Sequence, residues 1–107
     1  MTQDITDEKK SKLILLAEDS ITTRLQEKRI LESAGYDVIA AVDGFDAWSQ
    51  LSRFDFDAVV SDIMMPVMDG LELTRKIRSN KSFSSIPVVL VTSLSSEDDR
   101  RRGLDAG

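Results

Sequence analysis

Short apolar runs alternate with longer segments of helical periodicity along most of the chain. The apolar runs occupy residues 13–17, 36–41, 57–61 and 87–92 and are rich in leucine, isoleucine and valine, which favour strands. Residues 13–17 are apolar at every position. Because a strand in the middle of a parallel sheet is buried on both faces, this run predicts a central strand.

The first two helices are indicated by their end residues. Residues 20–35 predict a helix that ends at Gly35, because glycine readily adopts the left-handed conformation that stops helices. Asp43 stands where the N-cap of a second helix would lie. The spacing of the apolar side chains that follow predicts one face packed on the core, formed by Phe45, Trp48 and Leu51.

Two further helices are expected in the second half of the chain. Asp69 predicts the cap of a helix that buries Leu73 and Ile77, and residues 95–98 predict the start of a last helix ending near Gly107. Strands that alternate with helices form βαβ units. We therefore predict an α/β fold, with helices covering both faces of a parallel sheet.

Length and composition indicate one folded domain behind a polar tail. The chain has 107 residues, of which 41% are hydrophobic and 31% charged, as expected of a single soluble domain. Residues 1–11 are polar and show no periodicity, so we expect a flexible tail before a domain over residues 12–107. No apolar run approaches the ~20 residues of a membrane span, and the N-terminus is too polar for a signal peptide. A cytoplasmic location is the expectation.

The residue types that are missing narrow the chemistry further. The chain has no cysteine and no histidine, which excludes disulfides, thiolate chemistry, a histidine base and the usual ligands of transition metals. Lysine and arginine total 14 against 19 aspartates and glutamates, a net charge of −5 that argues against nucleic acid as a direct partner. Any chemistry must use carboxylates, hydroxyls, lysine or arginine.

Carboxylates follow two of the predicted strands. Glu18 and Asp19 come after the first strand, Asp62 after the third, and Thr92 ends the fourth. Because the carboxyl ends of neighbouring parallel strands meet at one edge, these side chains should converge. Two carboxylates ~4 Å apart repel by roughly 4 kcal/mol at an effective dielectric constant of ~20. The cluster must therefore hold a proton or bind a cation, for which Mg²⁺ is favoured, with Mn²⁺ or Ca²⁺ as substitutes.

A carboxylate beside Mg²⁺ can attack a phosphoryl group and form an aspartyl phosphate, which is the chemistry that Asp62 suggests. Each acid has a simpler explanation when it is taken alone. Asp19 is also a reasonable helix N-cap, and Asp62 is a reasonable first residue of a loop. Only a functional site explains why all of them converge with Thr92 on one edge.

At these residues the sequence resembles the receiver domain of bacterial two-component response regulators. The matching segments cover nearly everything after the tail: "LILLAEDS" (13–20), "AGYDVIAAVDGFDAW" (34–48), "FDAVVSDIMMPVMDG" (56–70) and "IPVVLVTSLSSEDDRRRGLDAG" (86–107). The sequence of these segments is similar to that of receivers fused to chemotaxis-type histidine kinases. The resemblance implies a flavodoxin-like, doubly wound parallel sheet with strand order 2-1-3-4-5.

The resemblance also implies a role for individual residues. Asp62 matches the phosphoacceptor, and Glu18 and Asp19 match the acidic pair that binds Mg²⁺ together with Asp62 and the backbone carbonyl of Met64. Thr92 matches the switch hydroxyl that turns toward the phosphoryl group. The loop between the acceptor and the next helix is shaped by Pro66 and Gly70.

Two features depart from the family pattern. Glu18 replaces the more usual aspartate and reaches one methylene further into the site. The family also continues into a fifth strand, which carries a lysine that pairs with the phosphoryl group, and a fifth helix. No lysine of this chain matches that position. The chain is thus either a natural short form or, as we expect, a fragment of a longer protein. We expect a sheet truncated to four strands and four helices, which binds Mg²⁺ but is phosphorylated poorly.

The function that this implies is a phosphoacceptor signalling domain rather than an enzyme. A histidine kinase or phosphotransfer partner would donate to Asp62, and the parent chain could be a hybrid histidine kinase. The main alternative is a receiver-like interaction module that acts without phosphorylation. A flavodoxin-like cofactor binder lacks its Gly-rich loop here, and a metal-dependent hydrolase lacks room for a substrate pocket. We also expect self-association through Ile21, Leu25 and the edge of the fourth strand.

Overall fold

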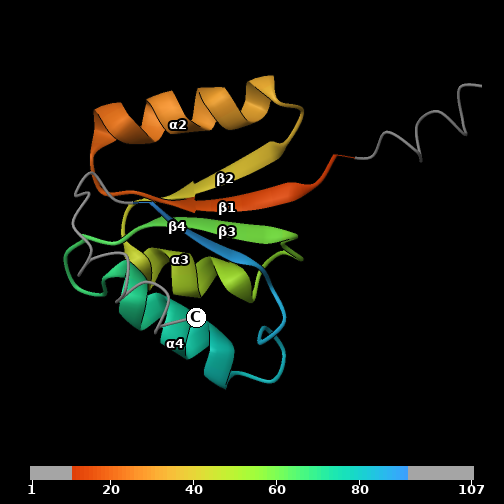
Figure 1. Cartoon of the computed structure of the whole chain (residues 1–107), viewed down its shortest axis with the longest axis vertical. Helices are drawn as coiled ribbons and strands as arrows, with labels where there is room; N and C mark the ends of the chain where they lie inside the picture. Colours follow the sequence, from red (N-terminus) through yellow and green to blue (C-terminus); the bar gives the residue numbers. More distant parts are fainter. Residues whose placement is uncertain (1–10, 92–107) are drawn as a thin grey trace, which may run out of the picture.

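The computed structural model of the chain describes residues 11–91 and shows a parallel four-stranded sheet with helices on both faces (Figure 1). The elements follow one another in the order β1 (Leu13–Ala17), α2 (Ile21–Ser33), β2 (Asp37–Ala41), α3 (Gly44–Leu51), β3 (Ala58–Asp62), α4 (Gly70–Ser79) and β4 (Val88–Val91). The strands lie side by side in the order β2-β1-β3-β4. The predicted α/β class and the flavodoxin-like arrangement are thereby confirmed.

The central position of β1 is also confirmed. Leu15 of β1 pairs with Ile39 of β2 on one side and with Val59 of β3 on the other. Both Leu15 and Leu16 are fully buried, so both faces of this strand are covered. Because β1 lies between β2 and β3, the residues that follow it emerge beside the end of β3. Three expectations lie outside the described residues: the tail, the role of Thr92, and the last helix.

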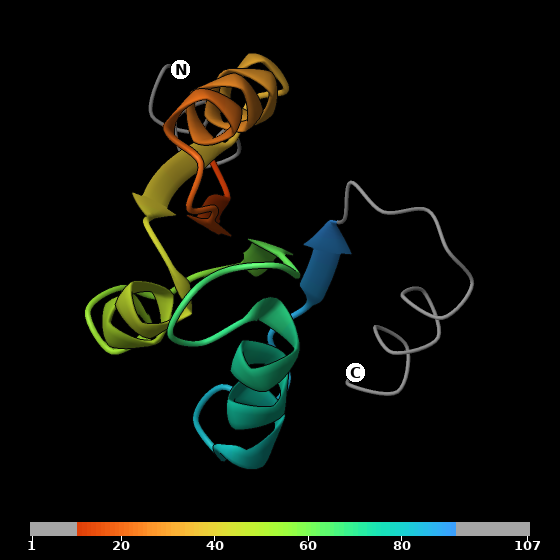
Figure 2. The same cartoon turned by 90° about the vertical axis from the view of Figure 1, so that its left-hand side faces the viewer.

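The two faces of the sheet are covered unequally. Figures 1 and 2 show α2 on one face, over β1 and β2, and α3 and α4 together on the other. The main core lies between the sheet and the α3–α4 layer and includes Leu15, Val59, Leu73 and Ile77, all fully buried. The predicted burial of Leu73 and Ile77 is thus confirmed. In contrast, α2 has no buried residue.

The predicted N-caps Asp43 and Asp69 form, because their side chains accept hydrogen bonds from the backbone N–H groups of residues 46 and 72. The N-cap of α2 is Ser20 rather than the candidate Asp19, and its side chain accepts a hydrogen bond from the backbone N–H of Thr23. After α2, Gly35 has a φ of 99°, the left-handed conformation that glycine adopts with little strain. Within residues 11–91, no helix is long and apolar enough to cross a membrane.

The prediction that Phe45 packs on the core is wrong. Phe45 is 57% exposed, whereas Ala47 and Leu51 form the buried face of α3 and Trp48 packs at its margin. Steps of three residues fall about 60° short of a full turn each time. The series Phe45, Trp48 and Leu51 therefore moves around the helix, and its first member points away from the core.

Candidate metal and phosphoryl site

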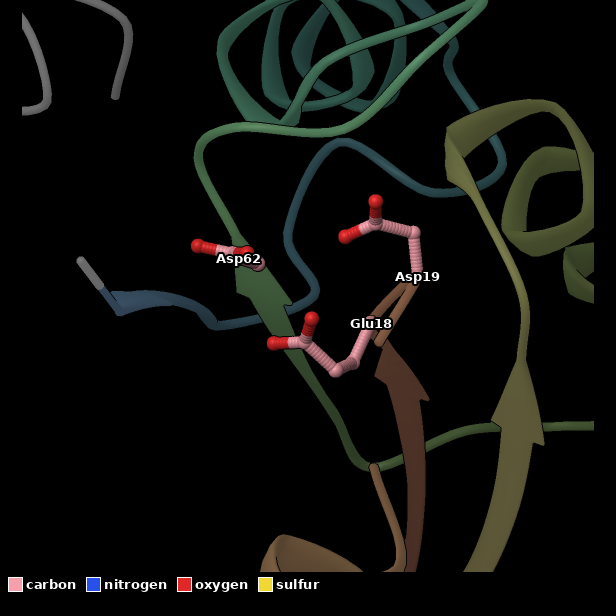
Figure 3. Close-up of side chains that lie close together, drawn as sticks. All are labelled: Glu18, Asp19 and Asp62. Carbon is pink, nitrogen blue, oxygen red and sulfur yellow. The ribbon is translucent and has the colours of Figure 1, made fainter. Parts of the chain in front are cut away.

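Three carboxylates meet at the ends of β1 and β3. Glu18 and Asp19 directly follow β1, and Asp62 is the last residue of β3. Figure 3 shows their side chains gathered over the carboxyl edge of the sheet. One carboxylate oxygen from each residue lies within 4.8 Å of those of the other two. The convergence expected from strand order is therefore present, although Asp19 and Asp62 are 43 positions apart in the sequence.

The turn that carries Glu18 and Asp19 is fixed by hydrogen bonds. The backbone N–H of Glu18 donates to the carbonyl of Ala41 at 3.1 Å, which extends the pairing between β1 and β2 by one residue. The backbone N–H of Ser20 donates to Glu18 Oε2 at 3.0 Å, and Arg24 Nη1 donates to the Glu18 carbonyl at 2.9 Å. The carboxylate and the backbone carbonyl of Glu18 are thus both hydrogen-bonded, which orients Glu18 and Asp19 before a ligand binds.

Burial makes Glu18 the most perturbed acid of the cluster. Its side chain is only 4% exposed, and burial raises its pKa to about 7, with smaller contributions from the charges of Asp62 and Glu27. The hydrogen bond from Ser20 opposes this rise. Without a cation the favoured state of Glu18 below neutral pH is therefore the protonated one.

Asp62 and Glu27 are shifted in the same direction. Burial raises the pKa of Asp62, the charge of Asp19 adds to the effect, and hydrogen bonds from the backbone of Ile63 and Met64 oppose it. Burial also raises the pKa of Glu27 on α2, with a contribution from the charge of Asp62. Four acids therefore share one electrostatic environment that disfavours their simultaneous ionisation.

The donor set fits a small, hard divalent cation. Carboxylate oxygens are the ligands that Mg²⁺ prefers, and no nitrogen or sulfur ligand is needed. A metal–oxygen distance of ~2.1 Å places two ligands of one ion at most roughly 4.2 Å apart. The oxygens of Glu18, Asp19 and Asp62 lie within 4.8 Å of one another, so these side chains would hold one ion after a small inward movement or with a bridging water in one ligand position. A cation would also offset the charge repulsion that adds to burial in raising the pKa values of Glu18 and Asp62.

The loop after Asp62 turns back tightly toward β3. The backbone N–H of Met68 donates to the Pro66 carbonyl at 2.7 Å, across Val67, whose φ is 69°. This is a γ-turn. Gly70 approaches the strand closely: its N–H donates to Ile63 at 2.9 Å, and a Cβ at Gly70 would overlap the Asp62 carbonyl oxygen. Loop-shaping roles for Pro66 and Gly70 agree with this geometry.

The structure brings together some of the expected site residues and adds others. Met64 follows Asp62 by two residues and is 59% exposed, so its side chain is not part of the core. Arg24 and Glu27 are site residues that were not predicted from the sequence. They are three residues apart on α2 and therefore share a face of that helix.

The comparisons with known proteins agree with this geometry. The family model described as the response regulator receiver domain matches residues 14–107. A gliding motility regulatory protein of Myxococcus xanthus is 37% identical over 94 residues, which are 88% of this chain and 12% of that protein. The sensor protein EvgS of Escherichia coli K12 is 43% identical over 88% of this chain and 8% of its own length. The chain thus spans about a tenth of these curated relatives.

A solved structure provides the same comparison in three dimensions. The receiver domain of a sensor histidine kinase from Pseudomonas aeruginosa PAO1 superposes with a TM-score of 0.83 at 33% identity. The match covers 91% of this chain and 80% of that one. That structure is described as having a magnesium ion coordinated in its active-site cleft.

Proposed function

Because the chain belongs to the family of response regulator receiver domains, we propose that Asp62 accepts a phosphoryl group from a partner histidine kinase or phosphotransfer protein. The observation that carries this proposal is the meeting of Glu18, Asp19 and Asp62 within 4.8 Å at the carboxyl edge of the sheet. A role as phosphoacceptor in signalling, rather than as an enzyme, follows from it. The cytoplasm is the compartment we propose for it.

Each acid has its own part in the proposed reaction. An oxygen of Asp62 attacks phosphorus, the new O–P bond forms, and the P–N bond to the donor imidazole breaks with its electron pair leaving on nitrogen. Glu18 and Asp19, together with Asp62 and the Met64 carbonyl, would hold Mg²⁺, which would supply positive charge that offsets the charge of the phosphoryl oxygens. Arg24 fixes the peptide that presents Glu18 and Asp19.

The proposed output passes through Thr92, whose hydroxyl would turn toward the phosphoryl group and shift an equilibrium between two conformations. The alternative is an interaction module that works without phosphorylation. The shared environment of four acids favours the phosphoacceptor, because a module that only contacts other proteins gains nothing from carboxylates that repel one another.

Acetyl phosphate provides a direct test that needs no partner protein. We expect the chain, incubated with acetyl phosphate and Mg²⁺, to gain the mass of one phosphoryl group slowly, and to lose it in hydroxylamine, which cleaves acyl phosphates. Asp62→Asn should abolish the gain. Asp55→Asn is the matched control, because Asp55 is exposed at the other end of the sheet and should leave the gain unchanged.

Two results would contradict the proposal. A mass gain in Asp62→Asn equal to that of the unmodified chain would place the phosphoryl group elsewhere. An absence of any gain, in a sample that binds Mg²⁺ and is folded by circular dichroism, would favour the module that acts without phosphorylation.

A further inference from the structure

Two adjoining hollows lie at the end of the molecule opposite the carboxylates. One, of about 580 Å³, lies between the end of α3 and the loop that leads into β4; the other, of about 300 Å³, lies beside it against α4. They share Trp48 and Asn80 in their walls. We call this surface the basic groove and define it by Trp48, Arg53, Arg75, Lys76, Asn80 and Phe83. In Figure 1 this end is where α3 and α4 finish and the chain turns toward β4.

The floor of the basic groove is aromatic and already ordered. Trp48 and Phe83 meet edge to face with their ring centroids 5.8 Å apart, and both are half-buried against the main core. The Nζ of Lys76 lies 4.9 Å from the centre of the Trp48 ring. Asn80 Oδ1 accepts the backbone N–H of Ser82 at 2.8 Å, which fixes the wall next to Phe83. A ligand would therefore meet a preformed surface.

The charge of the basic groove is opposite to that of the whole chain. Its two hollows are lined by three cations, Arg53, Arg75 and Lys76, and by no acid, although the chain carries a net charge of −5. Asp55 lines a third hollow that adjoins the groove at Arg53 and Phe83. Neither Arg53 nor Arg75 forms a salt bridge with a carboxylate within residues 11–91. Lys76 lies in the last turn of α4 and Arg53 follows α3, so part of their charge offsets the helix dipoles. The arginine side chains remain available to an anionic partner.

We propose that the basic groove binds a short acidic segment of a partner protein that also carries apolar side chains. Carboxylates of the segment pair with Arg53 and Arg75 at the rim, and an apolar side chain packs in the hollow against the exposed surface of the Trp48–Phe83 pair. This binding is separate from phosphoryl transfer, because the groove lies at the opposite edge of the sheet from Asp62.

The observations favour such a segment over two other anionic partners. Duplex DNA carries one charge per ~1.7 Å along its axis, far more than three cations can match, and the net charge of −5 repels it. A membrane surface is flat or convex on this scale, whereas these residues line hollows. A segment with a few acids and an apolar side chain matches both the charge and the concave shape.

Trp48 makes this proposal measurable, since it is the only tryptophan in the chain. We expect the capped peptide EELEELEE to shift the emission of Trp48 to shorter wavelength in a saturable manner, and added salt to weaken the binding. The peptide KKLKKLKK should cause no such shift. Equal responses to the two peptides, or no response to EELEELEE at millimolar concentration, would overturn the proposal.

Charge reversal locates the binding surface. The double variant Arg53→Glu/Arg75→Glu should bind EELEELEE at least about tenfold more weakly. Lys12→Glu/Arg29→Glu is the matched control, because it reverses two exposed cations away from the groove and makes the same change in net charge. If the first variant does not fold, Ser82→Glu tests the same wall. Equal losses in the groove and control variants, or tighter binding of a DNA oligonucleotide or phosphatidylserine vesicles than of EELEELEE, would overturn the proposal.

Discussion

The carboxyl group of Glu18 couples the stability of the domain to pH. Its pKa rises from 4.5 to about 7 on folding because the group is buried beside other acids. Between these values the unfolded chain releases the proton and the folded chain keeps it. The free energy of unfolding therefore falls as pH rises across this window, and it changes little above it. The raised pKa values of Asp62 and Glu27 act in the same direction.

Glu18→Gln tests this at the residue scale. In the absence of divalent metal we expect the variant to be more stable than the unmodified chain by about 2–3 kcal/mol at pH ~8, and by much less at pH ~4.5. Urea unfolding at the two pH values measures the difference. The control Asp55→Asn, at an exposed position away from the cluster, should change the free energy of unfolding by the same amount at both pH values. A loss of stability in Glu18→Gln at the higher pH would contradict this account of Glu18.

Residues of the site differ in how far sequence alone could find them. Asp19 and Asp62 were predictable because each directly follows an apolar strand. Arg24 and Glu27 were not, since a polar residue on an exposed-looking helix gives no sign that its side chain reaches a strand end. The prediction that Phe45 is buried was wrong for a related reason, because the spacing of apolar residues does not fix which side of a two-turn helix faces the core.

Elements were predicted better than their contacts. Within residues 11–91, the four strands and α2 agree with the predicted ranges to within one or two residues at their ends, and α3 and α4 begin directly after the predicted caps Asp43 and Asp69. The helix boundaries were predictable because they depend on local interactions. The side chains of Ser20, Asp43 and Asp69 cap the starts of the helices, and Gly35, which has no side chain, follows the end of α2. The extent to which α2 is buried was not predictable from the sequence, because it depends on which elements pack against the helix.

The exposed side of α2 and the edge strand β4 favour self-association, which we propose at the scale of elements. Ile21 and Leu25 are 67% and 50% exposed, and Val89 and Val91 of β4 are 52% and 37% exposed. Within the described part of the chain, β4 pairs with a strand on one side only. Apolar side chains beside an open strand edge promote pairing between copies.

A matched pair of variants tests this. Ile21 and Ile30 are equally exposed, at 67% and 66%, but they are nine positions apart and so lie on opposite sides of α2. We expect Ile21→Ser to reduce association with increasing concentration in sedimentation velocity experiments, and Ile30→Ser to leave it unchanged. A monomeric unmodified chain at high concentration, or equal effects of the two substitutions, would contradict the proposal.

At the scale of the whole molecule, the parallel sheet separates two surfaces of opposite charge. Its carboxyl edge gathers Glu18, Asp19 and Asp62, and the opposite end carries the basic groove. The alternation of strands and helices made the acidic edge predictable, because every strand of a parallel sheet ends on the same side. The groove was not predictable, because it depends on the loop after α4 placing Phe83 against Trp48.

The central claim is that Asp19 and Asp62 bind one divalent cation between them, and calorimetric titration with Mg²⁺ tests it most directly. We expect one Mg²⁺ per chain, a loss of affinity of at least about tenfold in both Asp19→Asn and Asp62→Asn, and no loss in Asp55→Asn. The double variant should lose little more than either single variant, because the two residues serve one site. Undiminished Mg²⁺ binding in Asp62→Asn, or no binding by the unmodified chain, would contradict the account.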